Sequence, residues 1–219
     1  YNVWFRTEGT HVERRMAAIA RLADSCGNGK KPSVLALQEL TPSLLALLSP
    51  LLRKAGYNEP YVQPWHTAGY NGQERYGVAI ATRQPMSPLV SPSYVPFVNS
   101  QMGRGLVMGG ATCASGQLLI GCVHLESYVG EAADPIVMPA RKAQLAQAGK
   151  LLEAEAVRRG CVGAMLLGDC NWNTKDGDAL AVIGPKWRDA YIEAGSPRGM
   201  ASTCYSWRLD RCFFLATNR

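Results

Sequence analysis

The chain has 219 residues, of which 47% are hydrophobic and 18% are charged, and its formal net charge is +6. This composition excludes an intrinsically disordered protein, and the length fits one sizeable domain better than two small ones. The sequence contains no run of about 18 apolar residues, which excludes a transmembrane helix. The basic residues form no block of five like charges, so we expect a dispersed basic surface. Such a surface favours an anionic partner such as nucleic acid, and the alternative is a basic domain without such a partner.

Hydrophobic periodicity predicts alternating strands and helices in the first third of the chain. In chain order we predict a strand over residues 1–5, a helix over 13–23, a strand over 33–38, and a Leu-rich helix from 42 to about 55. The first of these helices carries Met16, Ile19, Ala20 and Ala23 at helical spacing. Thr41 and Pro42 have the residue types of a helix cap and a first helical position.

The rest of the chain predicts more strands and hairpins than complete β-α-β units. In chain order we predict strands over residues 76–82, 104–112 and 117–123, a helix over 139–158, a strand over 162–167, a short helix over 187–194, and a strand over 207–215. Residues 114–116 indicate a hairpin, and the proline-rich residues 84–98 indicate a loop or an irregular edge strand. The predicted fold class is therefore α+β, a two-sheet β-sandwich flanked by helices rather than a Rossmann fold.

The seven cysteines are odd in number and lack C-x-x-C spacing. Several lie inside apolar runs, such as Cys122 and Cys212. This pattern predicts reduced, buried thiols of an intracellular protein, not zinc ligands or a disulfide framework.

The most informative stretch is Leu-Leu-Gly-Asp-Cys-Asn-Trp-Asn at residues 166–173. An apolar strand stops at Gly168 and is followed by Asp169 and Asn171. A glycine at a strand end allows a sharp turn and the close approach of a ligand. The two polar side chains would then suit a base and an orienting group for phosphate chemistry. Taken alone, the motif is also compatible with an ordinary turn.

Four further polar residues lie in or directly after predicted strands: Asn2, Glu39, His124 and Asp210. Each has an ordinary explanation, such as a solvated charge for Glu39, a core histidine for His124 or an ion pair for Asp210. Together with Asp169 and Asn171, they are expected to converge on one rim of the sandwich.

These residues stand in motifs that resemble the endonuclease/exonuclease/phosphatase superfamily and are most similar to its 5′-tyrosyl-DNA phosphodiesterase (type 2) branch. The motifs, in chain order, are Tyr-Asn-Val-Trp-Phe at 1–5, Leu-Gln-Glu at 37–39, Met-Gly-Arg-Gly-Leu at 102–106, His-Leu-Glu-Ser at 124–127, Arg-Lys-Ala-Gln-Leu at 141–145, Gly-Asp-Cys-Asn at 168–171 and Arg-Leu-Asp-Arg at 208–211. His-Leu-Glu-Ser followed by Arg-x-x-Gln-Leu favours the tyrosyl branch. The resemblance implies the four-layer α/β/β/α fold of that superfamily.

The resemblance also implies a role for each polar residue in Mg²⁺-dependent phosphodiester hydrolysis, with Mn²⁺ as an alternative ion. Glu39 is the expected metal ligand, and Asn2 positions that ligand or the phosphate. Asp169 is expected to orient and deprotonate the attacking water, while Asn171 hydrogen-bonds the water and a phosphoryl oxygen. His124 would donate to a non-bridging oxygen as negative charge develops.

Asp210 would orient a second histidine through its ring N–H. In the family this histidine belongs to a Ser-Asp-His motif that follows the Arg-x-Asp-Arg strand, and the sequence up to Arg219 does not contain it. We therefore expect residues 1–219 to be a single catalytic-type domain that is truncated at both ends.

The substrate implied by the resemblance is a 5′-phosphotyrosyl-DNA adduct left by topoisomerase, with a single-stranded 5′ end. Candidate DNA contacts are Arg104, Arg141, Arg208 and Arg211 for phosphates, and Tyr76, Trp172 and Trp207 for base stacking. We expect Trp4 and Trp187 to pack in the core. We further expect a monomeric DNA-repair hydrolase of the nucleus, with the cytoplasm as a second compartment and with no membrane association.

Two other functions remain open at this point. The chain could be another phosphodiesterase of the superfamily, namely a nuclease, a deadenylase or a lipid phosphodiesterase. It could also be a non-catalytic nucleic-acid-binding domain that lacks the final histidine.

Overall fold

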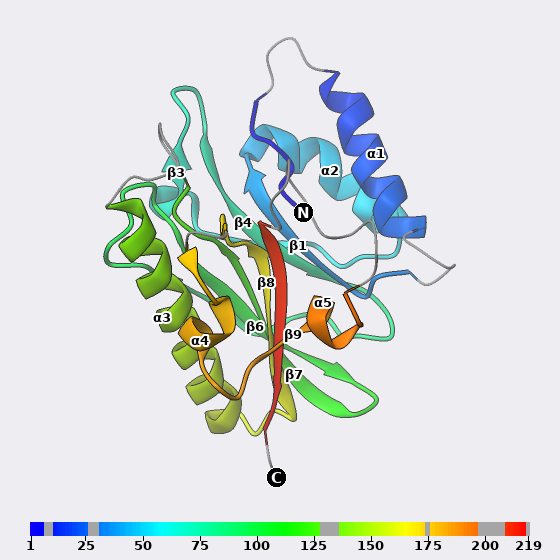
Figure 1. The fold of residues 1–219 in the computed structure, drawn as a ribbon. Coiled ribbons are helices and arrows are strands. Elements are labelled where there is room, and N and C mark those ends of the chain that lie inside the picture. Colours follow the sequence, from blue (N-terminus) through cyan, green and yellow to red (C-terminus); the bar gives the residue numbers. More distant parts are fainter. Residues whose placement is uncertain (7–10, 26–30, 128–135, 174–175, 197–208, 218–219) are drawn as a thin grey trace.

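The computed structural model describes residues 1–6, 11–25, 31–127, 136–173, 176–196 and 209–217 (Figure 1). Two β-sheets pack against each other, and helices cover their outer faces. This is the predicted α+β sandwich of four layers.

The two sheets divide the chain roughly at residue 90. The first sheet contains β1 (Val34–Leu40), β4 (Arg75–Thr82) and β2 (Tyr61–Val62) in that order, and β3 (Gly69–Tyr70) also pairs with β4. The second sheet has the order β5 (Val90–Pro96), β6 (Gly105–Cys113), β7 (Gly116–His124), β8 (Gly163–Asp169), β10 (Asp210–Ala216), β9 (Arg188–Asp189). The helices are α1 (Val12–Ser25), α2 (Pro42–Lys54), the 3-10 helix η1 (Trp65–Thr67), α3 (Val137–Arg158), α4 (Ala179–Ile183) and α5 (Ala190–Glu193).

Three apolar layers hold these elements together. The central layer lies between the sheets and includes Val78 and Ile80 from the first sheet with Val107 and Ile120 from the second. A second layer joins α1 and α2 to the first sheet. A third layer joins α3 and α4 to the second sheet. Burial of these side chains is the main stabilising contribution to the sandwich.

Helices α1 and α2 form as their sequence patterns predict. Helix α1 buries Met16, Ile19, Ala20 and Ala23, which are the four residues predicted to share its apolar face. The Thr41 side chain caps α2 by accepting a hydrogen bond from Leu44 N at 3.2 Å. The predicted cap and helix start are therefore confirmed.

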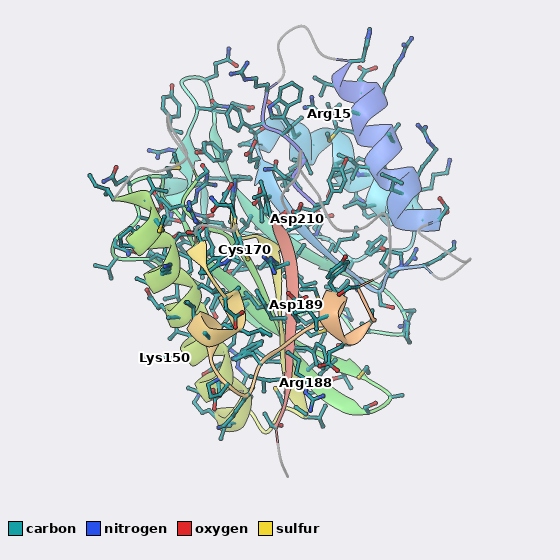
Figure 2. All side chains as sticks on the ribbon, viewed as in Figure 1. Arg15, Lys150, Cys170, Arg188, Asp189 and Asp210 are labelled. Carbon is teal, nitrogen blue, oxygen red and sulfur yellow. The ribbon has the colours of Figure 1, made fainter. Side chains whose placement is uncertain are left out.

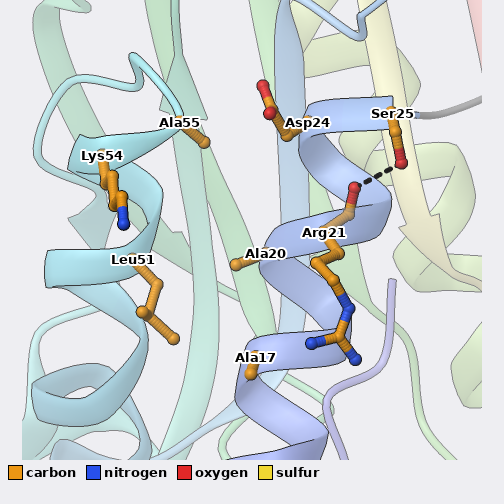
Figure 3. A pocket seen from close by; sticks show the side chains of 8 residues that line it. All are labelled: Ala17, Ala20, Arg21, Asp24, Ser25, Leu51, Lys54 and Ala55. Atoms are coloured by element: carbon orange, nitrogen blue, oxygen red, sulfur yellow. Dashed lines mark hydrogen bonds between the residues drawn. The ribbon is translucent and has the colours of Figure 1, made fainter.

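A groove of about 430 Å³ lies on the surface between α1 and α2 (Figure 3). Its lining includes Ala20 and Leu51 together with the charged residues Arg21 and Lys54. None of its lining residues belongs to the polar set that was expected at the strand ends. The groove is therefore separate from the candidate site.

The predicted strand over residues 1–5 is wrong. Only Asn2 forms a β-bridge, a parallel one with Gln38. The chain then turns away from β1, because the Asn2 side-chain oxygen accepts a hydrogen bond from Trp4 N at 2.9 Å and Trp4 adopts a left-handed φ of 59°. A side chain that bonds the backbone two residues on competes with strand pairing, which periodicity alone does not reveal.

Four other segments of the sandwich differ from the predictions or agree with them. The proline-rich segment forms the edge strand β5, which pairs with β6 through an irregular register between Val90 and Ser93. The predicted helix over 187–194 is partly wrong, because its first residues form β9 and pair with β10. The short helix α4 was not predicted, since five residues are too few to show a periodicity. The predicted hairpin is confirmed by the pairing of Cys113 with Gly116.

The cysteines of the described part carry free thiols, as predicted. Cys122 is buried, and its burial raises its pKa to about 11. Cys212 is only half-buried. None of the helices in the described part is long and apolar enough to span a membrane.

Gly168 allows β8 to lie close beside β7. A Cβ atom at this position would lie 2.0 Å from the carbonyl oxygen of Val123, and the φ angle of Gly168 is 150°. Any other residue would therefore have to separate the two strands directly before Asp169.

We predict that Gly168→Ala lowers the free energy of unfolding by at least about 3 kcal/mol, because it combines a backbone clash with a positive φ. Urea denaturation measures this loss. Gly56→Ala is the matched control, since Gly56 has a φ of 88° but no atom near its Cβ position. We expect the control to lose about 1 kcal/mol from backbone strain alone. Equal losses for the two variants would show that the close strand approach is not the constraint.

Candidate functional site

Three of the predicted polar residues lie side by side at the ends of neighbouring strands. The parallel pairing of β7 with β8 places His124 opposite Asp169, and the antiparallel pairing of β8 with β10 places Asp210 opposite Asp169. Figure 2 shows Asp210 at the end of β10 that faces the chain's N-terminal residues. The predicted convergence of these side chains is therefore a direct result of strand register.

Asn171 is held against Asp169 by the turn that follows β8. Its backbone N–H donates to Asp169 Oδ1 at 2.9 Å, and its side chain donates to the carbonyl oxygen of Leu125 at 3.0 Å. The φ angle of Asn171 is 49°, a left-handed value that asparagine tolerates better than most residues. The Asp-x-Asn spacing thus produces a tight turn as well as a polar pair.

Asn2 connects the two sheets at the site. Its side-chain amide donates to Glu39 Oε1 at 2.9 Å and lies 3.2 Å from Asp169 Oδ2. The other Glu39 oxygen accepts a hydrogen bond from Phe5 N at 3.2 Å. Glu39 lies within β1 and not after it, at a bulge where its φ is 58°. The half-buried carboxylate therefore points toward the second sheet instead of continuing the alternation of the strand.

Arg104 fixes the orientation of the His124 ring. One nitrogen of its guanidinium contacts His124 Nδ1, and the other donates to Ser127 Oγ at 3.2 Å. Since Arg104 can only donate, Nδ1 must accept, which assigns the ring proton of the neutral imidazole to Nε2. His124 Nε2 lies 3.7 Å from Asp169 Oδ2. The neutral tautomer thus directs an N–H toward the site.

Burial and neighbouring charges shift two pKa values in this cluster. Burial, and next to it the nearby Arg104 charge, lower the pKa of His124 well below its ordinary value. Burial, and next to it the Asp210 charge, raise the pKa of Asp169, and hydrogen bonds from Asn171 and Asn2 offset part of this rise. Perturbed pKa values of this kind, caused by burial and by specific partners, are typical of functional sites.

The site has the donors for a Mg²⁺ ion that keeps most of its water ligands. Among the residues that the structure describes, no group of three or more His, Cys, Asp or Glu side chains could hold a metal by itself. Mg²⁺ is typically bound through one or two carboxylates together with water and substrate phosphate. Glu39 offers one such carboxylate, and the mutually repelling pair of the buried Asp169 and the half-buried Asp210 favours a cation nearby.

Arg104 and Tyr76 have different positions from those predicted for DNA contacts. Arg104 is 6% exposed, and its guanidinium lies 5.3 Å from the centroid of the Tyr76 ring. Tyr76 is 8% exposed, and its ring stacks on that of Phe5 with the centroids 4.9 Å apart. Both residues belong to the wall behind His124, so they support the site instead of offering an open surface for DNA.

Arg141 and Trp172 are corrected more strongly. The Arg141 side chain is fully buried and donates to both carboxylate oxygens of Asp176, at 2.9 and 3.1 Å. Trp172 is also buried, and its indole N–H donates to the carbonyl oxygen of Gly177. Neither residue can contact DNA without opening the core.

The remaining predicted contacts divide into two groups. Arg211 forms an ion pair with the buried Asp189 at 3.1 Å. Arg208 and Trp207 lie outside the described residues. Of the two tryptophans expected in the core, Trp187 is buried as predicted, whereas Trp4 is 48% exposed and its assignment to the core is wrong.

A buried polar network supports the loop that precedes Arg104. The Glu126 carboxylate accepts hydrogen bonds from Ser100 Oγ, from the backbone N–H groups of Gln101 and Met102, and from Gln144 Nε2, at 2.8 to 3.1 Å. The backbone N–H of Glu126 donates in turn to Gln144 Oε1 at 2.8 Å. Ser100 Oγ also accepts from Arg104 N at 2.8 Å.

Sequence reasoning did not assign roles to Glu126, Gln144 or Ser100. The signal was present, because the resemblance to the tyrosyl branch rests on His-Leu-Glu-Ser and Arg-x-x-Gln-Leu. The structure shows that these motifs contact each other, since Arg141 also donates to the carbonyl oxygen of Glu126 at 3.0 Å. They form one support for Arg104 and His124.

Comparison with known proteins identifies the same fold. The sequence matches the model of the Endonuclease/Exonuclease/phosphatase family over residues 1–214. No curated protein matches the sequence.

Solved structures from several animals share this fold. Truncated TDP2 from Caenorhabditis elegans is 20% identical with a TM-score of 0.71, and the match covers 96% of this chain and 79% of that one. A longer form of the same worm protein is covered to 61%. TDP2 from D. rerio in complex with a single-strand DNA product is 17% identical with a TM-score of 0.66, covering 94% and 77%. The human Nocturnin catalytic domain with a bound sulfate anion is 18% identical with a TM-score of 0.74, covering 98% and 80%. At these identities the likeness establishes the fold.

We predict that the stability of the metal-free protein falls as the pH decreases from 7.5 to 5.5. The unfolded chain takes up a proton on His124 near pH 6.5, while the folded protein resists this until a much lower pH, so folding loses up to about 1.4 kcal/mol per pH unit in this range. Urea denaturation at several pH values measures the slope. His124→Asn should flatten it, whereas the same change at the exposed His66 should leave it in place. An unchanged slope in His124→Asn would contradict the neutral, buried imidazole.

We further predict that Glu126→Gln lowers the free energy of unfolding by about 1–3 kcal/mol, because an amide group would face backbone donors that now meet a carboxylate. Chemical denaturation measures this change. Glu193→Gln, on the exposed surface of α5, should cost less than about 0.5 kcal/mol. If Glu126→Gln were as mild as this control, the carboxylate would not be what holds the loop.

Proposed function

Since this chain belongs to the Endonuclease/Exonuclease/phosphatase family, we propose that it is a Mg²⁺-dependent phosphodiesterase that hydrolyses 5′-phosphotyrosyl bonds at DNA ends. Members of this family are typically metal-dependent phosphodiesterases or other hydrolases. The observation that carries the proposal is one cluster that joins both sheets at one rim. The Asn2 amide donates to both Glu39 and Asp169, and His124 Nε2 lies 3.7 Å from Asp169 Oδ2.

The cluster supplies the groups that in-line hydrolysis of a phosphodiester requires. Asp169 accepts a proton from the attacking water as the water oxygen bonds to phosphorus, and its raised pKa makes it a better base than an ordinary aspartate. Asn171 orients this carboxylate through its backbone N–H. The phosphorus–oxygen bond to the tyrosyl group breaks, and the phenolic oxygen leaves with the electron pair.

His124 stabilises the charge that develops on the phosphoryl oxygens. Its Nε2–H is a neutral donor whose direction is fixed by Arg104 on the opposite ring nitrogen. Such a pre-oriented donor needs no reorganisation during the reaction. Glu39, held by Asn2 and by the N–H of Phe5, is the residue that would hold Mg²⁺. The bound ion would supply Lewis-acid polarisation of the phosphate.

The acidity of a phenol leaving group supports a tyrosyl substrate for this site. A phenol has a pKa of about 10, far below that of an alkyl alcohol, so its departure needs less assistance from a general acid. The single-strand DNA product in the D. rerio TDP2 structure supports DNA as the other part of the substrate. The net charge of +6 is compatible with a polyanion. On this proposal the protein acts in DNA repair, in the nucleus.

A second candidate is a phosphodiesterase of the same family that acts on another substrate. It is favoured by the TM-score to Nocturnin, 0.74, which is similar to the 0.71 of worm TDP2. The two candidate functions use the same cluster of residues, but their substrates differ in the groups attached to the scissile phosphate. Substrate assays therefore distinguish them, and retained DNA binding without any hydrolysis would favour a non-catalytic domain.

We predict that the purified protein cleaves a 5′-phosphotyrosyl oligonucleotide with Mg²⁺ and not with EDTA, and faster than it cleaves abasic DNA, poly(A) or sphingomyelin. Asp169→Asn should reduce this rate by a factor of about 10²–10⁴, because it removes the base. Glu13→Gln, an exposed change on α1, is the control and should retain the wild-type rate. Comparable turnover by Asp169→Asn would refute the role of Asp169, and faster cleavage of one of the other substrates would refute the tyrosyl assignment.

A further inference from the structure

Trp4 is a large exposed aromatic residue two positions after Asn2 of the catalytic cluster. Its side chain is 48% exposed, although tryptophan normally buries most of its surface. The neighbouring Val3 is almost completely buried, so the exposure of Trp4 is a local feature and not that of a loose chain end.

The backbone around Trp4 is bonded directly to the groups of the site. The N–H of Trp4 donates to the side-chain oxygen of Asn2 at 2.9 Å, and the next N–H, that of Phe5, donates to Glu39 Oε2 at 3.2 Å. Trp4 therefore stands between the residue that bridges Glu39 and Asp169 and the residue that holds Glu39. The backbone of Trp4 thus lies directly beside the groups proposed to act on the scissile phosphate.

This conformation costs free energy and is held by specific contacts. A left-handed φ of 59° is unfavourable for any residue with a Cβ atom, and tryptophan rarely adopts it. Arg15 offsets the cost by donating to the carbonyl oxygens of Trp4 and Arg6, each at 2.9 Å. The Arg15 guanidinium also lies 5.5 Å from the centroid of the indole ring. Non-glycine residues that are held in strained conformations cluster at functional sites.

We propose that Trp4, positioned by Arg15, is a stacking site for the planar aromatic group attached to the scissile phosphate. An indole beside a guanidinium is a combination that binds nucleic-acid bases, because every base has a π-face and the cation attracts the adjoining phosphates. The phenol ring of a tyrosyl adduct could bind to the same surface, because it also stacks on an indole as a flat aromatic ring. The proposal rests on the proposed function for the identity of the ring and adds the residue that recognises it.

A binding experiment without metal tests the proposal independently of turnover. Fluorescence anisotropy in EDTA measures the affinity of the protein for a short single-stranded oligonucleotide with a 5′-phosphotyrosyl end. We expect Trp4→Leu, which keeps apolar bulk but removes the ring, to weaken binding about tenfold. Trp4→Phe, which keeps a ring, should stay within about threefold of the wild type. Circular dichroism of the two variants should match, because the residue is exposed.

Two modified oligonucleotides distinguish the sources of the ring. If the 5′-terminal base stacks on Trp4, an abasic 5′ nucleotide should remove the difference between the wild type and Trp4→Leu. If the phenol stacks, replacing the tyrosyl group by a plain 5′ phosphate should remove it. Either result supports the stacking site. Quenching of tryptophan fluorescence by the oligonucleotide should also decrease in Trp4→Phe.

Equal binding by the wild type, Trp4→Leu and Trp4→Phe would overturn the proposal. A loss in Trp4→Leu that persists with an oligonucleotide lacking both rings would overturn it as well, because the effect would then not be stacking. Failure of the proposed function has a different signature, since binding through Trp4 would remain while the tyrosyl substrate is not cleaved with Mg²⁺.

Discussion

In the second sheet, β7 and β8 run parallel and in register, so that His124 lies directly beside Asp169. The other parts of the site depend on this pairing. It requires Gly168 at the point of closest approach, and it leaves Asp169 next to Asp210 on the following strand. The Asn2 amide then joins this edge to Glu39 on the other sheet, so the relative position of the two sheets fixes the distance between Asp169, the proposed base, and Glu39, the proposed metal ligand.

The polar residues buried behind this edge serve position more than stability. An ion pair such as Arg141–Asp176, with both side chains fully buried, must first overcome the loss of water from two charges, so it contributes little net stability. Its geometric effect is large, because Arg141 also holds the carbonyl of Glu126 and Glu126 holds the loop that leads to Arg104. This chain of contacts ends at the His124 ring. Arg104 holds the ring so that its Nε2–H points into the site.

The electrostatic properties of the site follow from the same burial. Burial, and next to it the Asp210 charge on the neighbouring strand, raise the pKa of Asp169. Burial, and next to it the Arg104 charge, lower the pKa of His124 and keep it neutral. A site with one reactive carboxylate, one neutral donor and one outlying carboxylate for a cation fits hydrolysis of an anionic ester. In our proposal, the exposed indole of Trp4 adds a surface that recognises an aromatic ring of the substrate.

The sequence by itself determined the layers, the helix α1 with its buried face, the cap of α2, the β6–β7 hairpin and the polar residues at the strand ends. Periodicity and local hydrogen bonding act over a few residues, so these features can be read directly from the chain. Only the tertiary structure decided which side chains are open to a substrate. Arg141 meets Asp176 across 35 residues and Asn2 meets Asp169 across 167, and no local pattern encodes such partners. The same limit explains why Arg141 and Trp172 were expected on the surface and Trp4 in the core. The residue type alone does not say whether the fold buries a side chain or leaves it exposed.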